Sequence, residues 1–202
     1  MATVVIIAGQ AWLANSLALR PVWVFPALSG VLLIGSVAVY QSDVAEPSEA
    51  MRWLARALVA VLALANASCL LLLVRGIFVK SALDPLDLLL AGVVLWAVNI
   101  AVFALAYWEL DGGGPEDRAR SSGKLPDLVF PQQTDRNGLA PKDWKPGFAD
   151  YAYVSLTAAT AFSPTDTMPY SARAKLIMGS ESTISIAIAA MVVARAVNVA
   201  KG

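Results

Sequence analysis

Long stretches without a charged side chain are the feature that most constrains how this chain folds. A helix that crosses a bilayer needs about 20 consecutive, mainly apolar residues. The sequence contains uncharged runs near that length at 1–19, 21–42, 57–74 and 88–108. A further run, 176–194, is interrupted only by Glu181. We therefore expect an all-α integral membrane protein with about five transmembrane helices.

The composition supports this fold class and excludes several functions. Hydrophobic residues make up 58% of the chain and charged residues 15%, against about 25% charged residues in soluble domains. The net charge is zero, so we expect no nucleic-acid partner. Histidine is absent, which removes the commonest general base and zinc ligand. We therefore expect no enzyme activity, no catalytic residues, no cofactor and no metal site.

The chain divides into three predicted regions. Residues 1–110 hold N-terminal transmembrane helices at about 1–19, 21–42, 53–75 and 87–109. Residues 111–147 form a polar extramembrane loop, and 148–202 hold the last helix and the segment before it. Gln10, Asn15 and Ser16 weaken the first helix, which either spans the membrane or lies at its surface. It lacks a basic start, so it is a poor match to a cleavable signal peptide.

The connecting segments agree with this division. Residues 43–50 form an acidic connector, and Asp87 is placed to favour a helix N-terminus. The run from Asp111 to Pro115, Asp-Gly-Gly-Gly-Pro, ends the fourth helix abruptly. The loop that follows is rich in proline and glycine with mixed charges. Its length is typical of a functional or a disordered segment.

The most informative segment is 148–170. Its uncharged part, 151–165, is too short to cross a bilayer but suits a re-entrant or interfacial helix. Asp150 is placed to cap the start of this helix, and Pro164 must end it because proline lacks the amide donor. Irregular backbone at membrane depth is tolerated only when it is buried in protein or lines water. The pattern therefore predicts a pore helix and a pore loop, followed by an inner helix.

These residues resemble the pore segment of potassium-channel-type pore-loop ion channels. Residues 153–160, Tyr-Val-Ser-Leu-Thr-Ala-Ala-Thr, are similar to the aromatic pore helix of that family, which continues into TTVGYGD. Thr160 matches the first threonine, and Asp166 with Pro169 reproduces the Asp-x-x-Pro spacing. The stretch from Phe162 to Pro169 also resembles a signature of uncharacterised bacterial channel-like membrane proteins. That second resemblance covers about residues 88–202.

The departures from the potassium filter are as informative as the match. Ser163 and Thr165 replace the filter glycines, and Pro164 replaces its tyrosine. The potassium filter needs backbone conformations that glycine adopts readily and proline does not. Potassium selectivity is therefore not implied, and hydroxyls with the carboxylate of Asp166 become the expected ligands. The resemblance places the pore at Thr160, Ala161, Phe162, Ser163, Pro164, Thr165 and Asp166.

A second interpretation of this segment involves no pore. A short amphipathic helix and a turn would then seal the end of a helical bundle. In that arrangement Asp166 would cap the helix that begins near Ser171 by accepting amide hydrogen bonds.

Glu181 lies about ten residues into the last helix, near half depth at ~1.5 Å per residue. A carboxylate there costs ~2.5 kcal/mol or more unless it faces water or a partner. In a ring of identical chains, Glu181 and Ser185 would line a cavity that attracts cations, and crowding could keep the carboxyls protonated. Alternatively, Glu181 is hydrogen-bonded to a neighbouring helix, for example to Asn66 or Asn99.

Two arguments about orientation disagree. The channel resemblance places residues 111–169 outside, with Arg195 and Lys201 inside. The positive-inside rule favours the opposite, because the loop and its flanks, including Arg52 and Arg56, carry more basic residues. We follow the resemblance.

Together these observations predict a multi-pass protein of the cell (inner) membrane. Its predicted function is passive permeation of monovalent or divalent cations without potassium selectivity. One pore loop cannot enclose a channel, so we expect a homo-oligomer in contact with membrane lipid, a tetramer by resemblance. The alternative is a non-conducting structural or accessory subunit. A transporter is disfavoured because no internal repeat is found.

Overall fold

The computed structural model describes residues 1–17, 21, 23–41, 49–78, 85–120, 123–135, 137–160 and 166–201. Helices dominate, as expected for an all-α protein. The α-helices are α1 (Ala2–Ser16), α2 (Val24–Gln41), α3 (Glu49–Phe78), α4 (Pro85–Leu110), α5 (Pro115–Ala119), α6 (Phe148–Thr160) and α7 (Ala172–Lys201). The 3-10 turns are η1 (Asp111–Gly113) and η2 (Pro131–Gln133). The strands β1 (Leu128–Val129) and β2 (Met168–Pro169) pair antiparallel, with Leu128 opposite Pro169.

Three helical stretches of the described chain are long and apolar enough to cross a membrane, at Met51–Gly76, Leu86–Gly113 and Ala172–Ala194. They correspond to the spans expected at 53–75, 87–109 and 176–194, which supports a membrane protein. The two N-terminal expected spans also contain apolar helices. These are shorter in the described residues, at Ala2–Ser16 and Val24–Gly35.

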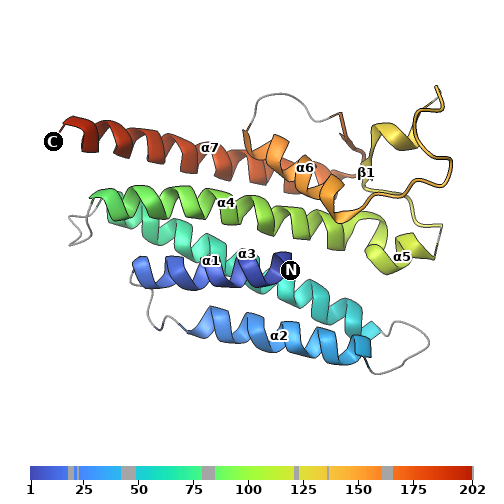
Figure 1. The fold of residues 1–202 in the computed structure, drawn as a ribbon, viewed down its shortest axis with the longest axis horizontal. Coiled ribbons are helices and arrows are strands. Elements are labelled where there is room, and N and C mark those ends of the chain that lie inside the picture. Colours follow the sequence, from blue (N-terminus) through green and yellow to red (C-terminus); the bar gives the residue numbers. More distant parts are fainter. Residues whose placement is uncertain are drawn as a thin grey trace.

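Helix α4 forms the centre of the bundle. It packs against α1 and α3 on one side and against α6 and α7 on the other (Figure 1). Its buried residues Leu88, Leu95 and Val102 belong to one hydrophobic core with Leu62 of α3 and Ile188 of α7. Helices α4 and α7 run side by side, while α6 lies along them near the end that carries α5 and β1 (Figure 1).

Polar side chains also join the helices inside this core. Gln10 of α1 donates to the carbonyl of Leu62 at 2.7 Å. Asn66 of α3 donates to Asn99 of α4 at 2.7 Å, and Asn99 donates to Ser185 of α7 at 3.0 Å. In an apolar surrounding such groups must find partners within the protein. The bonds therefore connect α1 to α3, and α3 through α4 to α7.

The helix starts follow ordinary capping rules. Asp87 lies in the first turn of α4, as expected. The side chain of Asp150 accepts the backbone N–H of Gly147 at 2.7 Å, before the first turn of α6. At α7 the capping residue is Ser171, whose hydroxyl accepts the backbone N–H of Ala174 at 3.0 Å. The second interpretation, in which Asp166 caps this helix, is therefore wrong on this point, because Ser171 occupies the capping position directly before Ala172.

The close approach of α4 and α7 gives a first prediction. A methyl group added at Gly92 would lie 2.6 Å from Cγ2 of Val192, whereas at Gly30 of α2 no described atom lies within 4 Å. Leucine at Gly92 should destabilise the protein by ~1–3 kcal/mol through overpacking. Leucine at Gly30 should have little effect. The single cysteine, Cys69, is buried, so its reaction with a thiol-reactive dye during heating in detergent measures unfolding. Equal melting temperatures for Gly92→Leu and Gly30→Leu would contradict the packing of α4 against α7.

Candidate functional site

The candidate site is the segment formed by α6 and the chain that follows it. One carboxylate, Asp111, anchors the N-terminal end of this segment. Its Oδ1 accepts the backbone N–H groups of Asp127 at 2.7 Å and Leu128 at 3.0 Å, and its Oδ2 accepts the hydroxyl of Tyr151 at 2.5 Å. Asp111 is buried. A single side chain thus joins the end of α4, the strand β1 and the first turns of α6.

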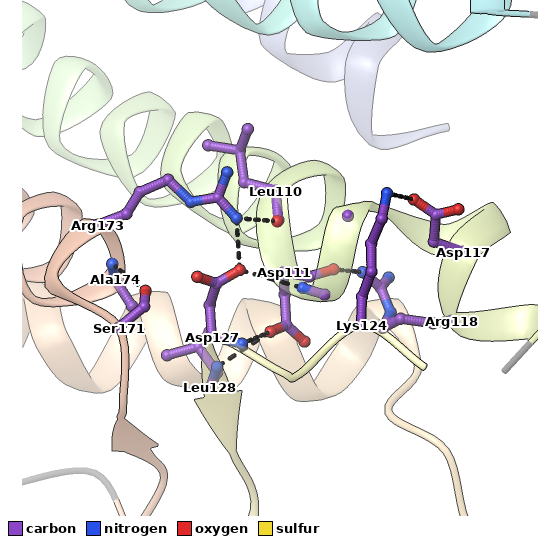
Figure 2. A network of polar contacts seen from close by, with 12 residues as sticks. Leu110, Asp111, Asp117, Arg118, Lys124, Asp127, Leu128, Ser171, Arg173 and Ala174 are labelled. Carbon is purple, nitrogen blue, oxygen red and sulfur yellow. Dashed lines mark hydrogen bonds and ion pairs between the residues drawn. The ribbon is translucent and has the colours of Figure 1, made fainter. Parts of the chain in front are cut away.

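A second carboxylate, Asp127, joins β1 to the start of α7 (Figure 2). It forms an ion pair with Arg173, which also donates to the carbonyl of Leu110 at 2.7 Å. The backbone N–H of Gly112, at a left-handed φ of 56°, donates to Asp127 at 3.1 Å. Burial alone would raise the pKa of Asp127. Hydrogen bonds from Ser171 and Arg173, with the charge of Arg173, outweigh burial and hold this pKa below its ordinary value.

Arg118 completes this end of the site. Its guanidinium donates to the carbonyls of Trp108 at 2.8 Å and Asp111 at 2.7 Å, which satisfies groups that the end of α4 leaves unpaired. The same guanidinium lies 4.8 Å from the ring centre of Trp108 and 5.0 Å from that of Tyr151. The loop 111–147 is therefore not a disordered connector in its described part. It forms a packed structure that positions α6.

The C-terminal half of α6 lies beside the middle of two spans. Ser155 donates to the carbonyl of Ile100 in α4 at 2.7 Å, and Ser182 of α7 donates to the carbonyl of Ala158 at 3.1 Å. After α6 the chain returns toward the end it came from, because β2 pairs with β1. The backbone N–H of Tyr170 accordingly donates to the carbonyl of Asp127 at 2.8 Å.

The sequence-predicted pore residues are only partly placed. Thr160 ends α6, and its hydroxyl donates to the carbonyls of Leu156 at 3.0 Å and Thr157 at 3.2 Å in the same helix. Asp166 is exposed, two residues before β2. Ala161, Phe162, Ser163, Pro164 and Thr165 lie outside the described residues.

The predicted cavity residues, Glu181 and Ser185, are both fully buried within the chain. The hydroxyl of Tyr107 donates to Oε2 of Glu181 at 2.5 Å, and Ser155 is hydrogen-bonded to Oε1. These contacts favour the interpretation in which Glu181 bonds a neighbouring helix. The partners are Tyr107 and Ser155, however, and not Asn66 or Asn99, which bond each other.

A count of protons shows what this cluster requires. The hydroxyl of Ser155 has one proton but contacts two oxygens, the carbonyl of Ile100 and Oε1 of Glu181. The carbonyl can only accept, so when Ser155 donates to it, the second contact needs a proton on Glu181. With that proton present, every group in the cluster is satisfied and no charge is buried. A neutral carboxyl is also the less costly form inside a membrane span.

Sequence reasoning missed several of these residues. Asp111 was interpreted only as part of the run that ends the fourth helix. A signal for Asp111 was present, because an acid next to three glycines is free to fold back on the helix end. No local pattern distinguishes Ser155 from the other hydroxyl residues of α6, since its role depends on Ile100 and Glu181.

The chain was compared with protein-family models, with curated proteins and with solved structures. No match was found in any of the three comparisons. The geometry of the segment itself is therefore the basis for inferring its function.

The proton count predicts how substitutions at Glu181 behave. Glutamine reproduces the neutral acid, because its amide donates to Ser155 and its oxygen accepts from Tyr107. Glu181→Gln should therefore melt close to the native protein in the Cys69 assay. Glu181→Ala leaves the buried hydroxyl of Tyr107 without its acceptor and that of Ser155 with the carbonyl of Ile100 alone, and should lose ~1–3 kcal/mol. If glutamine proved as destabilising as alanine, the cluster would require a charged carboxylate.

The Asp127–Arg173 pair predicts a dependence on pH. Because the pKa of Asp127 is lowered from 3.8, its stabilisation is complete above that ordinary value and is lost as the pH falls through the lowered one. Asp127→Asn should cost roughly 1 kcal/mol at pH 7, and the difference from the native protein should shrink toward pH 3. Melting at both pH values tests this, with Asp143→Asn, at an exposed loop carboxylate, as the control. A pH-independent difference would contradict the ion pair.

Proposed function

We propose that this chain is a multi-pass protein of the cell (inner) membrane that conducts cations through a pore built from α6 and residues 161–169. In this proposal α6 is a re-entrant pore helix, residues 160–166 line the constriction and α7 is the inner helix. The N-terminal helices α1 and α2 complete about five membrane helices. The pathway has no potassium selectivity.

The observation that carries the proposal is how far α6 reaches along the spans. Ser182, which bonds Ala158, lies ten residues into α7, or ~15 Å from its start. Ile100, which bonds Ser155, lies ten residues before the end of α4, again ~15 Å. Measured along either α7 or α4, the contacts of α6 thus lie at the same depth, which is about half of a ~30 Å hydrocarbon core. The pairing of β2 with β1 then returns the chain to its starting level.

The chemistry of the turn favours cations. The C-terminal end of α6 presents the partially negative end of a helix dipole toward mid-membrane. Thr160 lies at that end, and Asp166 adds a carboxylate near the mouth. Hydroxyls, carbonyls and carboxylates are the groups from which cation pathways are built.

The proposal needs several copies of the chain around one axis. Helix α7 offers a surface for such contacts, because its span is 17% buried, against 39% for α3 and 44% for α4. The exposed side chains Tyr153 and Leu156 extend this surface onto α6.

One observation favours a second candidate, a non-conducting structural subunit. Glu181 and Ser185 are satisfied by partners in the same chain. These two deep polar side chains therefore have partners without water or a neighbouring chain, as expected of a protein whose role is structural.

Cation flux in reconstituted liposomes distinguishes the two candidates. The native protein should carry K⁺ and Na⁺ at comparable rates. Asp166→Asn should reduce the flux roughly fivefold or more, since a unit charge close to a cation is worth ~1 kcal/mol even at the dielectric constant of water. Asp143→Asn, which alters an exposed carboxylate in the loop, is the matched control.

The Cys69 melting assay verifies that each variant is folded before flux is compared. Electrically silent liposomes containing folded native protein would favour the structural subunit. Flux unchanged by Asp166→Asn would remove this residue from the pathway.

A further inference from the structure

A small cavity lies at the loop end of the bundle, away from the segment proposed as the pore. Its volume is about 70 Å³, and it is formed by the first turns of α3 together with the end of α4, η1 and the start of α5. Four charged side chains line it, two cations from α3 and two carboxylates from the opposite wall: Arg52, Arg56, Glu109 and Glu116.

The cavity lies at the level of a lipid headgroup. The span Met51–Gly76 begins beside it, and the span Leu86–Gly113 ends beside it. Trp53 is 67% exposed. The guanidinium of Arg56 lies over its ring, 5.9 Å from the ring centre. An exposed tryptophan beside a half-buried arginine at the end of a span is typical of the membrane interface.

The carboxylates of this cavity lack donors. Oε2 of Glu116 is buried without a hydrogen-bond partner among the described residues. Within the same residues, the charges of Arg118 and Arg56 act on Glu109, but no side chain donates a hydrogen bond to it or forms an ion pair with it. A buried carboxylate oxygen without a donor is costly. The missing partner is therefore expected to be a cationic donor from outside the chain.

The arginines retain capacity for an anion. Arg56 makes one long hydrogen bond, to the carbonyl of Gly113 at 3.4 Å. Arg52 lies 3.8 Å from Asp117 and 3.8 Å from Glu49. A guanidinium has five N–H donors in a fork that matches the oxygens of a phosphate. Both side chains thus have donors left for a ligand.

We propose that this cavity binds the headgroup of a phospholipid that carries a primary ammonium, as phosphatidylethanolamine does. The ammonium donates to Glu116 and Glu109, and the lipid phosphate accepts from Arg56 and Arg52. The lining charges balance, two against two, which matches a zwitterion. An anionic headgroup would bring negative charge to two carboxylates that already lack donors.

The type of ammonium group distinguishes specific binding in this cavity from general attraction to the membrane. A primary ammonium donates up to three hydrogen bonds, whereas the trimethylammonium of phosphatidylcholine donates none. Both lipids have the same charges and the same phosphate. Preference for the ethanolamine lipid therefore reports hydrogen bonding to the carboxylates and not general attraction to the membrane.

Native mass spectrometry of the delipidated, folded full chain tests the proposal. It is titrated with phosphatidylethanolamine, phosphatidylcholine or phosphatidylglycerol of identical acyl chains, and with soluble phosphoethanolamine. Phosphatidylethanolamine should bind most tightly, with an affinity that falls roughly tenfold in Glu116→Gln. Asp143→Asn is the matched control, because it removes an exposed loop carboxylate that does not line the cavity.

Equal binding of the ethanolamine and choline lipids would overturn the proposal, as would an unchanged preference in folded Glu116→Gln. Soluble phosphoethanolamine that bound as tightly as the lipid would overturn the assignment to a membrane lipid. None of these measurements depends on cation flux, so the headgroup site and the pore proposal fail or succeed separately.

Discussion

The carboxylate of Asp111 is the contact on which the loop end of this protein depends. It lies where α4 stops, and its two oxygens accept hydrogen bonds from β1 and from Tyr151 of α6. Without it, the amides of Asp127 and Leu128 would be left without these acceptors against the aromatic cluster of Phe130 and Tyr151. The position of the first turns of α6, and with it the pore proposal, depends on this side chain together with the Asp127–Arg173 pair that holds the start of α7.

Helix α6 is short, and its polar groups find partners in the two spans beside it. Backbone groups inside a bilayer need partners within the protein. Ile100 and Ala158 carry carbonyls that accept hydroxyl protons from Ser155 and Ser182, so α6 is joined to both neighbouring helices by side chains. Serine suits this task because its hydroxyl bridges a short distance and adds little bulk between packed helices.

Sequence patterns predicted the elements better than their connections. Uncharged runs located α3, α4 and α7, since length and hydropathy are local properties. The sequence predicted that α6 is short, from Asp150 at its start and Pro164 after its end. The contacts between polar side chains in the middle of the spans could not be predicted from the sequence. The partners of Glu181 are Tyr107 and Ser155, which are 74 and 26 residues away in the chain. Asn66 and Asn99 were reasonable partners by residue type. In the fold Asn66 donates to Asn99, and Asn99 donates to Ser185.

The two buried acids that hold α6 differ in the donors around them, and this difference follows their depth. Asp111 accepts from two amides and a phenol, groups that each have a proton to give, so its oxygens are satisfied without a proton of their own. Glu181 meets two hydroxyls, and one of them also faces the carbonyl of Ile100. When Ser155 donates to Ile100, the deeper acid has one donor fewer than it has contacts, and a proton on its own carboxyl would supply the difference. A neutral carboxyl is the less costly form in the middle of a membrane span.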